Sequence, residues 1–272
     1  MFRFAYLALL VTVVSAVPVA ARQTDGDSAQ AASSRPPIIP GAAFAKRSQF
    51  SHTQLSPDGK VIVTKAVVDG AQSVALIDAA TQEPFRRFSI GEEHEIEWVR
   101  WAGSDKLLVS LSASGQWRGD DVRFTRLTFV DLRTGAMEVL GAKFPSIDGD
   151  NVVHIAKDGS HALVSVQKSL YEYPSVMRYE LRENGDARIL QRPIDGVWDW
   201  YADDAGVLRL GIGYLHRKLR IHYRANADDK FRLIEKIKED EFEEKFWDVR
   251  QIVSGSDEGY VLREGENGRV GL

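Results

Sequence analysis

The chain has 272 residues, of which 44% are hydrophobic, and 35 basic and 39 acidic side chains give a formal net charge of −4 at pH 7. This apolar content is enough to bury a substantial core, which excludes a wholly disordered chain. Because both signs of charge are mixed along the sequence and cysteine is absent, we expect no nucleic-acid partner, no disulfide, no thiolate nucleophile and no cysteine zinc site.

Residues 1–21 have the order of a secretory signal peptide. Arg3 is followed by an apolar run over residues 4–17 and then by small residues that end at Ala21. A run of about 14 apolar residues is too short to cross a bilayer about 30 Å thick as a helix. We therefore expect cleavage after Ala21, no stable membrane span, and a mature protein that is periplasmic or secreted.

Residues 22–43 are expected to form a flexible tether. Ser, Ala, Asp and Pro dominate this segment, and it has too few large apolar side chains to pack into a core. The folded part is expected to begin at Phe44 and to occupy residues 44–272.

A recurring unit sets the expected architecture of that part: an apolar strand, a short turn with Asp and often Gly, and a second alternating strand. If one aspartate in each turn is taken as a marker, successive turns stand 46 to 53 residues apart, which is typical of propeller blades. The markers are Asp58, Asp105, Asp158, Asp204 and Asp257. Each Asp is expected to hydrogen-bond the backbone of its own turn and each Gly to supply positive φ, so these residues need no chemical role.

A second hairpin lies between the marker turns in four of the periods. Its copies read ALIDAATQEPFRRF, TFVDLRTGAMEVL, RYELRENGDARIL and IHYRANADDKFRLI. Two hairpins per period give four short strands, which is the content of one blade. The sequence therefore predicts an all-β fold, a β-propeller of about four to five four-stranded blades that is incomplete or open. Residues 234–248 are expected to form a solvated connection between blades, with a helix that has a charged face as the alternative.

Two motifs in the first two periods resemble a known family. Residues 56–60 read SPDGK, and residues 98–112 read WVRWAGSDKLLVSLS. Together they resemble the N-terminal propeller of bacterial prolyl oligopeptidase-type serine peptidases, and the resemblance extends from about Phe44 to Leu272. Members of that family place the propeller before an α/β-hydrolase domain, and the propeller is thought to restrict the access of large substrates. The resemblance implies a propeller that gates the access of peptide substrates.

The chemical signature of that hydrolase domain does not occur in this sequence. The closest string to G-x-S-x-G, residues 255–259, puts Ser directly after Gly in a repeated turn. Glycine-rich phosphate loops are absent too, and the pair Gly211 and Gly213 lies in a strand pattern. We therefore expect no catalytic residue, no cofactor-binding residue and no metal ligand, and no enzyme activity for this chain alone.

The number of turn units suggests two kinds of partner. Five units are fewer than a propeller of the family would supply, so we expect the front part of a longer peptidase or a truncated reading frame. The partners would then be peptide substrates, which bind through a hydrolase domain that this sequence lacks. Open propeller edges would favour self-association. The alternative is a stand-alone periplasmic propeller similar to TolB, whose SPDG turns look alike and which presents loops to a protein partner.

Histidines and tryptophans are the remaining candidates for a site. His154 and His161 flank a turn and are expected to be partly exposed side chains rather than zinc ligands. His216 and His222 have the even spacing of one strand face, but two ligands are too few for a metal site. The tryptophans are expected to fill space between blades, with a ring that grips a peptide or glycan in the central channel as the alternative. They are Trp98, Trp101, Trp198, Trp200 and Trp247.

Overall fold

The computed structural model describes residues 40, 49–68, 70–91, 93–144, 146–242, 248–264 and 268–272. The chain divides into two units, Met1–Lys46 and Arg47–Leu272, and every helix and strand described lies in the second unit. The expected signal peptide, the tether and the start at Phe44 lie outside the described residues, except for Pro40 of the tether.

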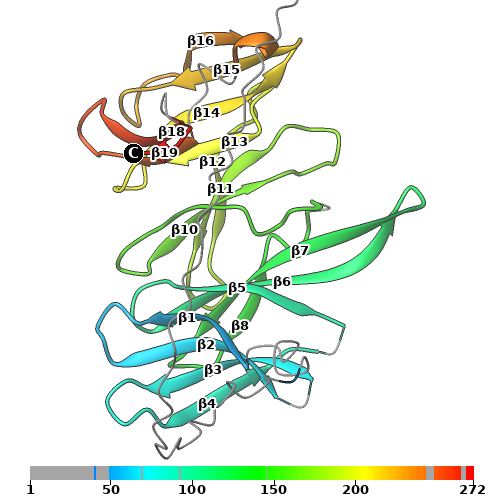
Figure 1. Cartoon of the computed structure of the whole chain (residues 1–272), viewed down its shortest axis with the longest axis vertical. Coiled ribbons are helices and arrows are strands. Elements are labelled where there is room, and N and C mark those ends of the chain that lie inside the picture. Colours follow the sequence, from blue (N-terminus) through cyan, green and yellow to red (C-terminus); the bar gives the residue numbers. More distant parts are fainter. Residues whose placement is uncertain are drawn as a thin grey trace, which may run out of the picture. The chain divides into compact units, whose positions relative to one another are not determined.

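Five antiparallel sheets follow one another along the chain (Figure 1). The first contains β1 (Phe50–Leu55), β2 (Val61–Val68), β3 (Ala71–Asp78) and β4 (Pro84–Ser89). The second contains β5 (Glu95–Trp101), β6 (Lys106–Trp117), β7 (Asp120–Asp131) and β8 (Met137–Leu140). The third contains β9 (Val152–Ile155), β10 (His161–Val166), β11 (Ser175–Glu180) and β12 (Ala187–Gln191). The fourth contains β13 (Asp199–Ala202), β14 (Leu208–Leu215), β15 (Lys218–Tyr223) and β16 (Arg232–Lys238), and the fifth contains β17 (Asp248–Ile252), β18 (Gly259–Glu264) and β19 (Val270–Gly271).

Within each sheet, neighbouring strands are consecutive in the sequence. Up-and-down sheets of four short antiparallel strands, repeated along the chain and packed face to face, are the blades of a β-propeller. The fold is therefore an all-β propeller with five blades in the described residues, four of them four-stranded, and the predicted fold class is confirmed. A single short 3-10 helix, Glu239–Glu241, is described, and no described helix is long and apolar enough to cross a membrane.

Hydrophobic clusters lie between consecutive blades. Leu107 of β6 packs with residues of blade 1, whereas its neighbour Leu108 packs with residues of blade 3. In the same way, Leu163 of β10 packs toward blade 4 and Val164 toward blade 2. Successive strand residues point to opposite faces, so a sheet between two others must be apolar on both. This explains why the middle strands have nearly continuous apolar sequences instead of strict alternation.

The marker turns of blades 1 and 3 are built as predicted. Asp58 Oδ1 accepts a hydrogen bond from the Lys60 backbone N–H at 3.3 Å, and Asp158 Oδ1 accepts one from the Ser160 N–H at 2.9 Å. The turns of blades 4 and 5 differ from the prediction. Their marker aspartates bond the neighbouring blade. The turn of blade 4 is one residue shorter than that of blade 1, and Asp203 accepts its backbone hydrogen bonds instead of Asp204.

The two displaced markers connect blades rather than seed turns. Asp204 Oδ1 accepts a hydrogen bond from the N–H of Ser254 in blade 5 at 2.8 Å. Asp257, in the first turn of blade 5, bonds Arg209 and Tyr223 of blade 4. The expectation that each marker bonds its own turn is therefore wrong for Asp204 and Asp257. It is also wrong for Asp105, whose Oδ2 lies 2.8 Å from Nε of Arg133 in the second turn of blade 2.

The stretch 234–248 is also a correction. Residues up to Lys238 belong to β16, which pairs with β15 in the register Lys218↔Lys238, so neither a helix nor a connection occupies 234–238. The connection begins at Glu239, and residues 243–247 lie outside the described residues. Strand β16 is the outermost of its sheet, and charged side chains are common on such edges. Its mixture of isolated apolar and charged residues therefore resembles an exposed helix.

Candidate functional site

The blades have two distinct ends. Backbone hydrogen bonds join the turn after the first strand to the turn after the third, as in Ala79 N–H to Lys60 O (2.9 Å) and Leu181 N–H to Ser160 O (2.9 Å). The hairpin between the second and third strands therefore lies at the opposite end, together with the connection to the next blade. We call residues 117–120, 167–174, 194–198 and 214–218 at that end the loop face.

The hairpin of blade 2 extends farther than any other hairpin in the described residues. Strands β6 and β7 have 12 residues each, whereas β5 has seven and β8 has four. Strand β5 pairs with β6 only as far as Glu95↔Ser112, but β6 and β7 stay paired to Trp117↔Asp120. Figure 1 shows this two-stranded ribbon running beyond the rest of its sheet. The long hairpin thus brings the tip of blade 2 into contact with the loop of blade 3, residues 167–174.

Arg118 lies at the tip of that ribbon. Its backbone has φ 54° and is followed by Gly119 at φ 91°, which is the left-handed pair of a tight hairpin turn. The guanidinium carbon lies 5.7 Å from the ring centre of Trp117 and 5.5 Å from that of Tyr171, and Nη2 donates a hydrogen bond to the Tyr171 hydroxyl. A guanidinium at this distance from aromatic rings is held by cation–π attraction. Blades 2 and 3 therefore meet at an arginine between two aromatic rings.

The loop of blade 3, residues 167–174, continues the contact to blade 4. The rings of Tyr173 and Trp198 are edge to face with centres 5.1 Å apart. Beneath them, the buried Trp200 donates a hydrogen bond from Nε1 to Pro174 O at 3.2 Å, and Gln167 Nε2 donates to Glu172 O at 3.0 Å. These bonds hold the loop in one conformation between the two neighbouring blades.

The resulting surface is aromatic and accessible. Tyr171 is 76% exposed and Trp198 is 44% exposed, while Trp117 and Tyr173 are half-buried. Aromatic rings with a polar edge are enriched at binding surfaces, because they bury much area with few rotatable bonds. Together with the donors of Arg118, these rings can stack on apolar or aromatic groups of a ligand and bond its carbonyl or carboxylate oxygens.

The tryptophan predictions hold for three of the five residues. Trp200 is 5% exposed in the cluster between blades 3 and 4, and Trp98 and Trp101 pack against the clusters of blade 2. Trp98 also donates a hydrogen bond from Nε1 to Asp150 Oδ2 at 3.1 Å. Trp198 does not fill space between blades, since it lies on the loop face. Trp247 lies outside the described residues.

His161 contacts a serine but is not arranged as a catalytic base. Its Nδ1 lies 2.9 Å from Ser160 Oγ, and its Nε2 lies 3.1 Å from Nη1 of Arg178. Because arginine only donates, Nε2 is the acceptor and Nδ1 carries the proton. A catalytic triad needs a carboxylate at that second nitrogen to stabilise the imidazolium. Burial and the Arg178 cation instead hold the pKa of His161 below its ordinary value of 6.5.

The other histidines do not gather into a metal site among the described residues. The ring centres of His154 and His161 lie 6.3 Å apart, and burial and His161 lower the pKa of His154. His216 lies in the turn after β14 with φ 53°, whereas His222 is buried in β15, so the two do not share a strand face as expected. In the part of the chain that the structure describes, no group of three or more His, Cys, Asp or Glu residues could hold a metal ion.

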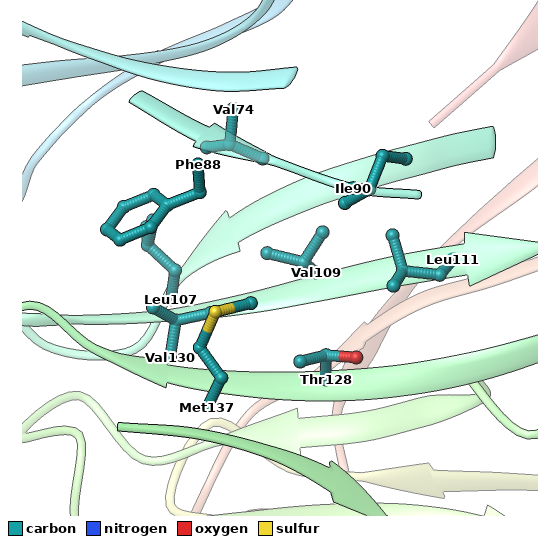
Figure 2. A pocket seen from close by; sticks show the side chains of 9 residues that line it. All are labelled: Val74, Phe88, Ile90, Leu107, Val109, Leu111, Thr128, Val130 and Met137. Atoms are coloured by element: carbon teal, nitrogen blue, oxygen red, sulfur yellow. The ribbon is translucent and has the colours of Figure 1, made fainter. Parts of the chain in front are cut away.

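The apolar hollow between blades 1 and 2 is too small for a ligand. Figure 2 shows nine side chains around it, with Phe88 and Ile90 on one side and Thr128 and Met137 on the other. Its volume is about 10 Å³, which is at most the room for one water molecule. The hollow is therefore a packing gap, and the buried Thr128 hydroxyl beside it has no hydrogen-bond partner among the described residues.

Sequence reasoning missed Trp117, Arg118, Tyr171 and Tyr173. One signal was present: WRGD stands between two alternating runs, and a glycine in such a place marks a hairpin. The other signal was the length of the segment 167–174, which is long for a connection between hairpin strands. Neither signal reveals that the two segments meet, because they belong to different blades.

No protein-family model matches the chain, and no curated protein matches it. Among solved structures, it is similar to TolB from Acinetobacter baumannii, with 14% identity, a TM-score of 0.38, and 71% of this chain and 45% of that chain covered. It is similar to the β-propeller domain of the trilobed protease from Pyrococcus furiosus (14% identity, TM-score 0.42, 69% and 56% covered). It is also similar to the acylaminoacyl peptidase of Pyrococcus horikoshii (15% identity, TM-score 0.48, 81% and 36% covered). The chain thus spans 36 to 56% of the length of these three chains, and its own sheet order and stacking identify it as a β-propeller.

Proposed function

We propose that this chain is the non-catalytic propeller region of an exported, prolyl oligopeptidase-like serine peptidase, located in the periplasm or outside the cell. In this role it gates the access of peptides to a hydrolase domain that is not among residues 1–272. The observation that carries the proposal is the loop face, where Arg118, Tyr171 and Trp198 from three consecutive blades form one accessible aromatic surface. The resemblance of the SPDGK and WVRWAGSDKLLVSLS motifs supports the same family.

The chemistry of the loop face suits an extended peptide. Proline and aromatic side chains of a peptide stack on exposed tyrosine and tryptophan rings, as in other proteins that bind extended segments. The guanidinium of Arg118 has further N–H donors for peptide carbonyl oxygens. Because the rings come from blades 2, 3 and 4, a peptide that contacts all of them is held across blade boundaries, so its approach depends on how the blades are arranged.

The contribution of this chain is contact rather than bond cleavage. The Ser160 and His161 pair lacks the carboxylate that a triad requires, and Arg178 occupies its place. The chain by itself is therefore expected to hydrolyse no chromogenic peptide or ester. Turnover that a serine-directed inhibitor abolishes would contradict this part of the proposal.

The genomic reading frame tests the family directly. The coding DNA is read past the codon for Leu272 in all frames. Further blades followed by a G-x-S-x-G motif between a strand and a helix would support the peptidase. A stop codon followed by unrelated sequence would contradict it and favour the stand-alone TolB-like propeller that binds a protein partner.

A binding assay tests the loop face itself. Fluorescence anisotropy with a labelled, proline-containing peptide compares the wild type with Tyr171→Ala and Trp198→Ala. We expect each variant to bind about tenfold more weakly, because each removes a stacking surface worth about 1–2 kcal/mol. Phe85→Ala and Tyr260→Ala are matched controls, since these aromatic residues are 56% and 50% exposed but lie outside the loop face. Equal affinities for all four variants would contradict the proposed surface.

A further inference from the structure

Four basic side chains share one face of blade 4. Lys218 pairs with Lys238 and Arg220 pairs with Lys236 in the antiparallel register of β15 and β16. Residues directly opposite in such a ladder point to the same face, and so do residues two apart on one strand. We call Lys218, Arg220, Lys236 and Lys238 the basic tetrad.

The tetrad is an unfavourable arrangement for a surface that binds nothing. Directly opposite side chains have Cβ atoms about 4.5–5.5 Å apart, and like charges at that separation destabilise a sheet. Two such pairs stand side by side, about 7 Å apart along the strands. The lysines are exposed and Arg220 is half-buried, so their charges stay close together at the surface.

Carboxylates do not neutralise the tetrad. Within the described ranges, none of its four side chains has an ion pair, whereas nearby Arg217 pairs with Glu239, Nη2 to Oε2, at 3.0 Å. Glu235 pairs in register with Ile221 and so belongs to the opposite face of the sheet. Among the described residues, no ion pair therefore balances the positive charge of the tetrad, although Glu239 and Asp240 follow Lys238 directly in the sequence.

Arg220 is the half-buried member of the tetrad. Its Nε is buried and has no hydrogen-bond partner among the described residues. The next residue on the same face, His222, is 9% exposed, and its Nδ1 is also buried without a partner. The Arg220 guanidinium is thus half-buried, with none of its donors used by a described acceptor.

An open hollow adjoins two members of the tetrad. Lys218 and Lys238 line it together with His216, Arg217, Glu239 and Asp240, and its volume is about 540 Å³. This is more than enough room for a small anion and its hydration shell. A ligand can therefore reach the tetrad from solvent at the loop-face end of blade 4.

We propose that the basic tetrad binds a phosphate group. A phosphate has a charge near −2 and several acceptor oxygens, so it can accept bonds from donors on both strands at once. A single carboxylate has one charge and two oxygens and neutralises less of the cluster. The four residues of the tetrad are distinct from Arg118, Tyr171 and Trp198, the proposed peptide contacts, although Lys218 stands at the edge of the loop face.

Titration with inorganic phosphate tests the site in the intact chain. Calorimetry and thermal melting compare sodium phosphate with sodium chloride at equal ionic strength. Phosphate is expected to bind and to raise the melting temperature of the wild type more than chloride does. Equal responses to the two salts, together with no vesicle binding, would overturn the proposal.

Matched variants locate the response. Lys218→Gln with Lys238→Gln removes two charges at exposed positions and is expected to weaken phosphate binding at least about tenfold. Lys157→Gln with Lys230→Gln makes the same change of net charge at exposed lysines outside the tetrad and is expected to leave the affinity unchanged. Arg220→Lys keeps the charge but loses the guanidinium fork, so an intermediate loss is expected. Equal affinities for both double variants would overturn the proposal.

Vesicles distinguish the sources of the phosphate group. Co-sedimentation is measured with phosphatidylcholine vesicles and with vesicles that also contain phosphatidic acid, whose head group is a phosphate monoester. Binding only to the second kind, lost in the Lys218→Gln, Lys238→Gln variant, supports a lipid head group as the source. A response to free phosphate without vesicle binding supports a soluble phosphate compound. Vesicle binding that the double variant retains would overturn the assignment to the tetrad.

Discussion

Arg209 on the second strand of blade 4 and Asp257 in the first turn of blade 5 lie 3.0 Å apart, Nη2 to Oδ1. The same guanidinium donates to Ser256 O at 2.9 Å and to the Tyr223 hydroxyl at 2.6 Å, and its Nη1 lies 3.3 Å from Asp203 Oδ2. The Arg209 side chain is 2% exposed. A buried polar network therefore joins blades 4 and 5, whereas hydrophobic clusters join blades 1 to 4.

Replacement of Arg209 is expected to destabilise the propeller strongly. Arg209→Met leaves Asp203, which is 3% exposed, without its cationic partner, and breaking a buried pair in this way costs about 3–5 kcal/mol. Asp257→Asn removes only a partner that is 74% exposed and should cost at most about 1 kcal/mol. Urea unfolding measures both free energies. Similar small losses for the two variants would contradict the buried network.

Stability is expected to fall as the pH decreases through the titration range of the histidines. Burial is the largest cause that lowers the pKa values of three histidines, His154, His161 and His222, below 6.5. A neighbouring positive charge lowers each pKa further: His161 acts on His154, Arg178 on His161, and Arg220 on His222. A histidine whose folded pKa is depressed binds fewer protons in the folded state, so its stabilising contribution is present above about pH 6.5 and is lost as the pH falls through the folded pKa. Thermal melting between pH 8 and pH 5 measures the loss. His161→Gln should reduce this pH dependence, and an unchanged slope would show that His161 does not contribute to it.

Gly213 is expected to tolerate no side chain. An added Cβ would lie 1.7 Å from the carbonyl oxygen of Gly196, in the connection that crosses β14. The backbone must move to relieve that overlap, so Gly213→Ala should cost at least about 1–3 kcal/mol. Gly271→Ala is the control, because an added Cβ there meets nothing within 4 Å. Equal melting temperatures for the two variants would contradict the close approach of the connection.

Arg118 is expected to contribute to ligand contact rather than to the stability of its turn. Its φ of 54° is better suited to asparagine, which adopts left-handed conformations more readily. Arg118→Asn should therefore leave stability unchanged or raise it by about 0.5 kcal/mol, while it loses the cation–π contacts and weakens peptide binding. Unfolding and peptide-binding curves on the same preparation separate the two effects. A variant that binds peptide as well as the wild type would contradict the role of Arg118.

The fold was accessible from the sequence because turn chemistry repeats. Gly59 and Gly159 adopt the positive φ expected of them, at 75° and 68°, and the blade period follows from such turns. The assignment failed at Asp204, because a turn one residue shorter directs this aspartate to blade 5, and it failed at Asp257, which bonds blade 4. Side-chain roles therefore depend on turn length, which the approximate repeat does not resolve.

The candidate site was not accessible in the same way. Arg118 and Tyr171 are 53 residues apart in the chain, and their contact depends on how far the hairpin of blade 2 extends past its neighbours. That extension is a property of strand pairing, since β5 ends its ladder at Ser112 while β7 continues. Likewise, the basic tetrad depends on the register of β15 and β16. Polar residues outnumber apolar ones in β16, so its apolar pattern does not fix that register.

Hydrogen–deuterium exchange with an extended, proline-containing peptide tests the central claim most directly. At saturating peptide, the account predicts slower exchange in residues 113–124, which contain the loop-face segment 117–120, and in the loop-face segment 167–174. It predicts no change in the turns at the opposite end, residues 57–60 and 79–83. Protection confined to those opposite turns, or no protection in 113–124 and 167–174, would contradict the assignment of the loop face as the peptide-binding surface.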